Sequence, residues 1–246
     1  MIAAKRVLVA GATGAIGRVL CRLLVSDGWQ VVGTTRRAEA APALMAMGVA
    51  PAIVDVLDAD ALHAVVLAAR PSAVIHQLTD LPKQFEHDAL REALPRNARL
   101  REVGTRHLVD ACVDAGVGHV IVQSIAFAYA PGPIPQSEDA PLNIDAADKM
   151  AAQTARAVHV MERLVLSGPF RGVVLRYGRL YGPGTWTDVP PSAAPVHVDA
   201  AAEAARLALT RGEAGVYNVA EPDGTVSITR TVTQLGWDPS FRMPAD

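Results

Sequence analysis

Three glycines near the start of the chain have a spacing that suggests chemistry: Gly11, Gly14 and Gly17. They follow an apolar run and precede a helical pattern. The first glycine permits backbone angles that other residues resist, the second lets a pyrophosphate approach the main chain, and the third lets the helix pack closely on the strand. A phosphate then faces free N–H groups at the helix N-terminus. The spacing predicts a dinucleotide site, although a Gly-rich turn in an ordinary α/β protein has the same appearance.

An arginine pair indicates which dinucleotide is bound. Arg36 and Arg37 follow the second predicted strand, about 20 residues beyond the glycines, where NAD enzymes normally place a carboxylate for the ribose hydroxyls. A guanidinium matches phosphate oxygens and stacks on adenine, whereas a carboxylate repels a 2′-phosphate. We therefore expect NADP(H), with a solvated surface turn as the alternative. Asp55, after the third strand, either accepts from the adenine amino group or lies in an exposed turn.

The elements that must position these residues alternate along the chain. Short apolar runs predict strands at residues 6–10, 30–35, 52–54, 73–77, 120–123 and 172–176. Ala- and Leu-rich stretches predict helices at residues 16–26, 58–69, 92–115 and 147–166. The βαβα order and the continuous apolar character of the strands predict a doubly wound parallel sheet, a Rossmann fold, in a single domain spanning 1–246. Pro-rich segments at 130–141 and 182–195 follow strands, where ligand-binding loops occur, although plain surface connections would look alike.

Composition narrows the class of protein. The chain has 246 residues, half of them apolar, with 23 basic and 25 acidic residues intermixed and a net charge of −2. This balance disfavours nucleic acid and a membrane surface as partners and favours a small-molecule substrate. Cys21 and Cys112 lie in helical apolar patterns without metal-ligand spacing, which predicts buried thiols in a reducing compartment and no metal site. No secretory signal or apolar stretch of 18 residues is recognised, so we expect a cytoplasmic protein.

Several segments in order resemble one superfamily. They are Gly11–Gly17, Asp55–Val56, Ala73–Leu78, Gly104–Ala111, Val122–Ser124 with Tyr129, Leu175–Gly184 and Val196–Asp199. Together the segments resemble the short-chain dehydrogenase/reductase superfamily, in its extended or atypical branch, the NAD-dependent epimerase/dehydratase family. The resemblance implies a cofactor site made of the glycine turn, the arginine pair and the residues after the third and fourth strands: Gly11, Thr13, Gly14, Ala15, Ile16, Gly17, Arg36, Arg37, Asp55, Val56, Gln77 and Leu78.

The usual catalytic pair of this family is missing. Relatives use a serine to orient the substrate, and a tyrosine for proton transfer whose pKa is lowered by a lysine four residues later. Ser124 fits the serine position approximately, but no Tyr-x-x-x-Lys occurs in the chain. When Glu162 is aligned with the family's helical glutamate, Thr154 and Val158 stand at the tyrosine and lysine positions. Tyr129 is the preferred displaced proton donor, with packing at the pocket wall as the equal alternative.

The substrate portion, within residues 178–246, is reduced. Only 13 residues separate Pro183 from His197, and 28 follow Asn218, where extended relatives carry a small substrate domain. A trimmed lid disfavours nucleotide sugars. The leading hypothesis is an NADP(H)-dependent oxidoreductase acting on a small carbonyl, imine or hydroxyl compound, with Ser124 and Tyr129 as catalytic candidates. Alternatives are an epimerase, dehydratase or lyase without net redox, and a non-catalytic NADP(H) sensor. A homodimer through helices 92–115 and 147–166 is a further expectation.

Overall fold

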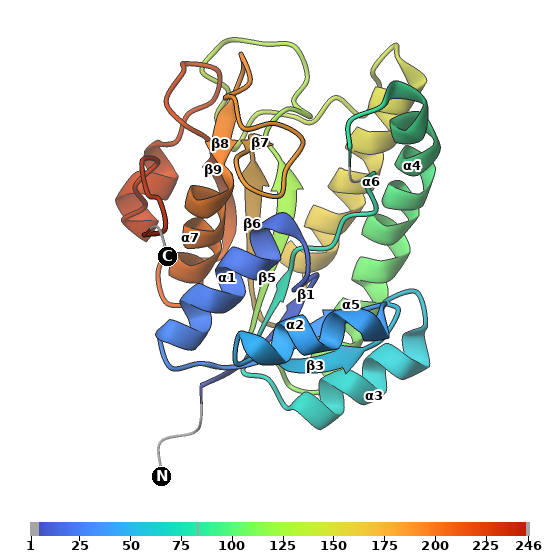
Figure 1. The fold of residues 1–246 in the computed structure, drawn as a ribbon. Coiled ribbons are helices and arrows are strands. Elements are labelled where there is room, and N and C mark those ends of the chain that lie inside the picture. Colours follow the sequence, from blue (N-terminus) through green and yellow to red (C-terminus); the bar gives the residue numbers. More distant parts are fainter. Residues whose placement is uncertain (1–4, 83, 245–246) are drawn as a thin grey trace.

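A parallel sheet forms the centre of the molecule. The computed structural model describes residues 5–82 and 84–244. Seven strands pair in the order β3-β2-β1-β4-β5-β6-β9, every neighbouring pair parallel (Figure 1). They are β1 (Arg6–Ala10), β2 (Gln30–Thr35), β3 (Ala50–Ile53), β4 (Ala73–His76), β5 (His119–Ile125), β6 (Arg171–Tyr177) and β9 (Gly215–Val219). A separate parallel pair consists of β7 (Arg179–Tyr181) and β8 (Pro195–His197). The strand order reverses between β1 and β4, which places the ligand crevice of such sheets there.

Helices cover both faces of this sheet (Figure 1). One face carries α1 (Ala15–Ser26), α2 (Ala41–Ala46) and α7 (Val198–Ala208). The other carries α3 (Ala59–Ala69), α5 (Thr105–Asp114) and α6 (Lys149–Leu166), with α4 (His87–Arg99) packed on α6. Three short segments complete the list: the 3-10 turn η1 (Ala38–Ala40) and the π-helical turns η2 (Leu100–Gly104) and η3 (Thr231–Leu235).

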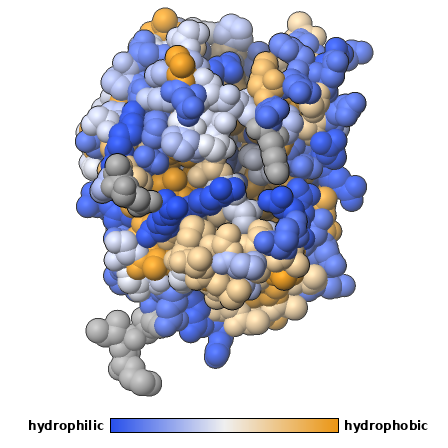
Figure 2. Space-filling view, viewed as in Figure 1, coloured by the Kyte–Doolittle hydropathy of each residue, from blue (hydrophilic) through white to orange (hydrophobic). Residues whose placement is uncertain are grey.

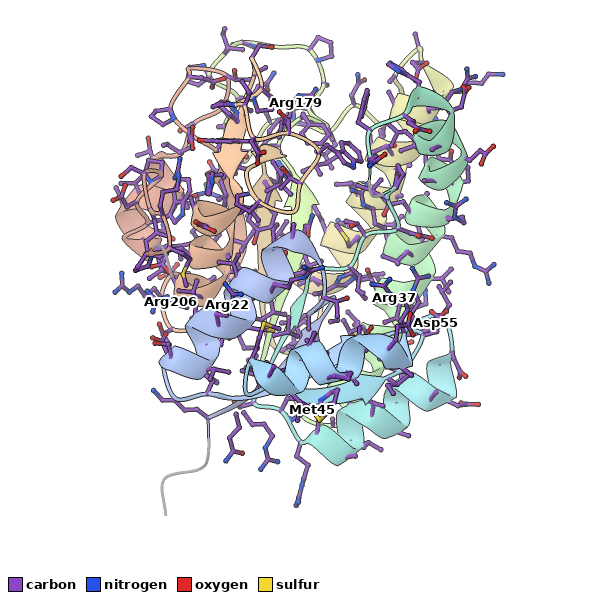
Figure 3. The ribbon with its side chains drawn as sticks, in the orientation of Figure 1. Arg22, Arg37, Met45, Asp55, Arg179 and Arg206 are labelled. Carbon is purple, nitrogen blue, oxygen red and sulfur yellow. The ribbon has the colours of Figure 1, made fainter. Side chains whose placement is uncertain are left out.

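The core has two halves because side chains alternate along each strand. In β1, Val7 and Val9 join the cluster under α1 and α7, whereas Leu8 joins the cluster under α3, α5 and α6. At the edge of the first half, Arg206 on α7 donates to Glu203 at 2.6 Å and to Asp27, just after α1, at 2.8 Å (Figure 3). The bond to Asp27 links the C-terminal ends of α7 and α1, and the bonds to Glu203 lie within α7.

The predicted doubly wound Rossmann fold is confirmed, and the differences lie in element boundaries. The helix predicted at residues 92–115 is wrong in extent: α4 starts at His87, contains Pro95 and continues through η2 into α5. The polar residues at the start of α4 hide its periodicity, and a proline inside a helix normally predicts a break. Neither α2 nor β9 was expected. The short strands β7 and β8 were not expected either. The limits of β1 and β2 agree with the prediction, and those of β3, β4, β5 and β6 differ from it by up to two residues.

The surface and the thiols complete the description. In the space-filling view, hydrophilic residues cross the middle of this face above weakly hydrophobic atoms over α2 (Figure 2).

Within the described ranges, no helix is long and apolar enough to span a membrane. Cys21 and Cys112 are buried free thiols, as predicted, and burial raises the pKa of each to about 12. No group of three or more His, Cys, Asp or Glu side chains suited to a metal ion occurs in the same ranges.

Candidate active site

A cavity of about 1450 Å³ opens along the carboxyl edge of the sheet. Its lining comes from the glycine turn, the ends of β2, β4, β5 and β6, the first half of α6 and the loop after β7. Figure 3 shows Arg179 in the upper part of the molecule and Arg37 well below it, and both residues line the cavity. A single small ligand fills a pocket of ~300–1000 Å³. The cavity therefore has room for a dinucleotide and a small substrate together.

The glycine turn has the geometry that its sequence predicts. Gly11 has a φ of +90°, and a Cβ there would lie 2.7 Å from the carbonyl oxygen of Gln77. A Cβ on Gly17 would overlap the carbonyl oxygen of Gly11, so this glycine lets α1 pack against the turn. The Gly14 N–H donates to the Gly11 carbonyl at 3.0 Å, and no side chain caps α1. The first-turn N–H groups of α1 are thus left to a ligand, which suits a pyrophosphate.

The adenosine end of the cavity is basic. Arg36 and Arg37 line it with side chains about half exposed: Arg36 lies 3.5 Å from Asp80 and Arg37 lies 3.9 Å from Glu39. Arg18 lines the same region and donates to the Thr13 carbonyl at 2.9 Å. Sequence reasoning missed Arg18, although an arginine directly after the third glycine was a visible signal. Arg18, Arg36 and Arg37 all line the cavity and are called the arginine arc below; guanidinium groups can bind a phosphate through paired N–H donors.

The predicted cofactor residues mostly meet at this cavity. Its lining includes Gly11, Thr13, Gly14, Ala15, Arg36, Arg37, Val56, Gln77 and Leu78. Ile16 and Gly17 are instead buried beneath the turn, where they support it. The Asp55 carboxylate accepts from the Leu57 N–H at 3.0 Å and is not part of the lining. Its geometry matches the exposed-turn alternative, and contact with adenine stays a prediction.

Ser124 belongs to a buried polar network behind the cavity. Its hydroxyl donates to Glu162 Oε1 at 2.6 Å, and its side chain is fully buried. Arg176 donates from Nε to Oε1 of Glu162 at 2.9 Å and from Nη2 to Oε2 at 2.7 Å. The network ties α6 to β5 and β6. Ser124 as a substrate-orienting residue stays a prediction, and a substrate would have to replace its bond to Glu162.

Tyr129 lines the cavity, and its hydroxyl is hydrogen-bonded within the protein. The hydroxyl donates to Asn218 Oδ1 at 2.6 Å, and the Arg176 guanidinium lies 4.9 Å from the ring centroid. Burial raises the pKa of Tyr129, an effect that Arg176 partly offsets. Its role as a proton donor stays a prediction. The structure also shows the packing role that was its alternative.

The wall where relatives place the catalytic pair is mostly apolar. Val158, at the lysine position, is fully buried in a cluster with Ile125, Ala128 and Ala155. Thr154, at the tyrosine position, lines the cavity and supplies the wall with a hydroxyl. Val158 therefore provides no cation to lower the pKa of a neighbouring hydroxyl, and Thr154 ionises far less readily than tyrosine.

A buried amide and a buried guanidinium also border the cavity. Gln77 donates from Nε2 to the Tyr177 hydroxyl at 3.3 Å, while its Oε1 has no partner among the described residues. Such an orphaned acceptor fits a site that is completed by a bound donor. Arg101, from the π-helical turn η2, is 6% exposed and lines the cavity. Sequence reasoning missed Arg101, because a basic residue inside a long helical pattern normally lies on a solvated face.

The fold and this site define a class: an α/β protein of the Rossmann type with a nucleotide-sized cavity at the switch point of its sheet. Residues 7–195 match the NAD dependent epimerase/dehydratase family, and the chain belongs to this family. The expected family resemblance is thereby confirmed.

Known relatives include both reductases and epimerases. The chain is 50% identical, over 181 residues, to a 3-diazoavenalumate denitrifying reductase from a Streptomyces species; the alignment covers 73% of this chain and 58% of that protein. The chain thus spans less than two thirds of that relative. A UDP-glucose 4-epimerase from Thermotoga maritima, solved with UDP-glucose, superposes with a TM-score of 0.77 at 16% identity, covering 96% of this chain and 94% of the other. The Thermus thermophilus UDP-glucose 4-epimerase in complex with NAD superposes with a TM-score of 0.67 at 25% identity. The superposition covers 95% of this chain and 84% of the other.

Proposed function

We propose that the chain is an NADP(H)-dependent reductase that acts on a small aromatic compound carrying a diazo group. The substrate class comes from the relative that is half identical over the aligned residues, a denitrifying reductase of 3-diazoavenalumate. The cofactor preference rests on the arc of Arg18, Arg36 and Arg37 at the end of β2. Guanidinium groups favour a 2′-phosphate. The chain has arginines at the positions after the second strand where NAD enzymes have a carboxylate that binds the ribose hydroxyls.

The observation that carries the proposal is the apolar wall around Val158. Reduction of a carbonyl needs a proton for the nascent alkoxide, which relatives obtain from the tyrosine and lysine pair. Replacement of a diazonium group by hydride needs no proton. In the cationic aryl diazonium form of such a substrate, NADPH held by the glycine turn and the arginine pair would supply a hydride to the ring carbon. The C–H bond would form as the C–N bond breaks and N₂ leaves with that bond's electron pair, so that NADPH would become NADP⁺ and no proton would be consumed. A wall without a tyrosine and lysine suits this reaction.

The chain's own residues would bind and shield the substrate. The apolar cluster of Ile125, Ala128, Ala155 and Val158 keeps water from the reacting carbon, where water would give the phenol. Phe127 lines the same cavity and stacks with Arg179, whose guanidinium carbon lies 4.5 Å from the ring centroid. Across the mouth, Trp186 donates to the Pro82 carbonyl at 2.8 Å and joins two loops. An aromatic substrate therefore meets apolar and aromatic surfaces.

Labelled cofactor tests this function directly. The purified protein is mixed with 3-diazoavenalumate and NADPH carrying deuterium at the transferable position. We expect loss of NADPH absorbance, release of N₂ and one deuterium in the product. Gly11→Val is the matched control: because its side chain would meet Gln77 backbone at a φ of +90°, it should abolish both cofactor binding and turnover.

Other outcomes identify the alternatives. If the protein turns over a small carbonyl, imine or hydroxyl compound but no diazo compound, it is an oxidoreductase of those compounds. Conversion of UDP-glucose without net change in NADPH would make the chain an epimerase. Tight NADPH binding with no turnover of any of these compounds would indicate a sensor and contradict the proposal.

A further inference from the structure

Arg101 is a buried cation that forms no hydrogen bond or ion pair within the described part of the chain, and only the Glu162 carboxylate stabilises its charge, through space. Its side chain is 6% exposed, faces the cavity and makes no hydrogen bond or ion pair with any residue in 5–82 or 84–244. Buried charges in proteins are normally paired, because an isolated one loses its hydration without compensation. Arg101 therefore lacks a directly bonded anion among the described residues, and the cavity that it lines has room for one.

The π-helical turn explains why this arginine points inward. In η2 the wider turn places two consecutive residues, Leu100 and Arg101, on the cavity lining. At Gly104 an added Cβ would come within 3.0 Å of the Val56 side chain, so the glycine lets η2 approach the strand edge. Single π-helical turns frequently occur at functional sites. The long predicted helix is thus interrupted where it delivers a guanidinium to the cavity.

Two ionisable groups interact electrostatically with Arg101, Glu162 favourably and His76 unfavourably, and both are already hydrogen-bonded to other residues. Glu162 uses Oε1 for Ser124 and Arg176, and Oε2 for Arg176. His76 accepts the Leu78 N–H at Nδ1, so its proton lies on Nε2 toward Thr105, 3.0 Å away. Burial lowers the pKa of His76 to about 4, which keeps the ring neutral. Burial lowers the pKa of Arg101 to about 10, and its guanidinium is still charged at neutral pH.

The carboxylates of the cavity lining also have partners. Asp80 pairs with Arg36 at 3.5 Å and Arg96 at 3.3 Å, and Asp148 accepts from the Ala151 N–H at 2.8 Å as the cap of α6. Neither is bonded to Arg101. The cofactor phosphates, for their part, have the uncapped N-terminus of α1 and the arginine arc after β2.

We infer that Arg101 is the anion site for the substrate and that the substrate carries a carboxylate. A guanidinium that forms no hydrogen bond with the described residues can offer two parallel N–H groups to two carboxylate oxygens. The inference deepens the proposed reductase function and rests on it only for calling this ligand the substrate. Arg101 would then select arenecarboxylates over their neutral esters and hold the ring against the apolar wall.

A binding experiment tests this without turnover. Calorimetry on NADP⁺-saturated protein compares 4-hydroxycinnamate with its methyl ester. We expect the acid to bind at least tenfold more tightly than the ester. Arg101→Met should remove this preference and leave ester binding and NADP⁺ affinity within about twofold. Arg101→Lys should keep part of it, because the charge remains. The control is Arg179→Met, which removes a more exposed cation of the same cavity and should preserve the preference.

Three results would overturn the inference. Equal binding of acid and ester to the unaltered protein would mean that no carboxylate site exists. Loss of NADP⁺ affinity in both Arg101 variants would make Arg101 a cofactor residue. Loss of the preference in Arg179→Met alone would move the site to the mouth. None of these depends on diazo chemistry, so failure of the reductase proposal is seen separately, as absence of turnover with acid preference intact.

Discussion

The buried pair of Glu162 and Arg176 gives the sharpest prediction. Glu162→Gln removes the charge that compensates Arg176 while keeping the shape of the side chain. Both side chains are about 5% exposed, and the pair is held by two bonds of 2.9 Å or less. Removing one partner of such a pair lowers the free energy of unfolding by about 3–5 kcal/mol. We expect the lower end, ~3 kcal/mol, because the glutamine amide can still accept a hydrogen bond from Arg176. With an unfolding entropy near 0.5 kcal/mol/K for 246 residues, Tm should fall by ~6 °C.

The assay is thermal and urea unfolding followed by circular dichroism. Asp145→Asn is the matched control, because it removes an exposed partner of Arg156 at 3.4 Å and should cost less than about 0.5 kcal/mol. Ser124→Ala should cost ~1–2 kcal/mol through its bond to Glu162, with kcat within about threefold. In the Ser124→Ala/Glu162→Gln double variant, the two costs should not add. Equal Tm shifts for Glu162→Gln and Asp145→Asn would refute the reasoning, and a large loss of kcat in Ser124→Ala would support the predicted role of Ser124 in orienting the substrate.

Three further predictions concern the cofactor, the wall and the thiols. Arg36→Ala/Arg37→Ala should reduce the preference for NADPH over NADH by ~30–150-fold in fluorescence titration, since each half-exposed guanidinium contributes about 1–1.5 kcal/mol to binding a phosphate. An unchanged ratio would contradict the proposed NADP preference. Thr154→Val should change kcat with a diazo substrate by less than about threefold, whereas a hundredfold loss would make Thr154 a proton donor. Cys21 and Cys112 should resist a thiol reagent at pH 8 until urea unfolds the chain, because burial holds each pKa near 12; rapid labelling of the folded protein would contradict the buried positions.

The cofactor end was predictable from the sequence because local rules govern it. A glycine at a positive φ, a strand before it and an amphipathic helix after it are enough to define the turn around Gly11. The arginine pair could be assigned to the cavity because Arg36 and Arg37 directly follow the second predicted strand. Arg18 was not predicted as a cavity residue, because the glycine spacing by itself accounts for a phosphate turn in that segment.

The reacting end was less predictable because it depends on packing between distant segments. The sequence shows Ser124 as the last polar residue of its strand, but only the folded chain shows that Glu162 on α6 takes its hydroxyl. Arg101 reads as a surface residue until the π-helical turn rotates it inward. In the same way, the helix predicted from residue 92 begins five residues earlier, at His87, in the folded chain.

The α6 helix has consequences for how this scaffold can change. Its cavity side carries Thr154 and Ala155, whereas Glu162, two turns later, braces β5 and β6 from behind. Chemistry and framework therefore occupy separable parts of one helix. Substitutions in the first half can reshape reactivity while the brace stays whole, which makes α6 a suitable place for directed evolution of new hydride acceptors.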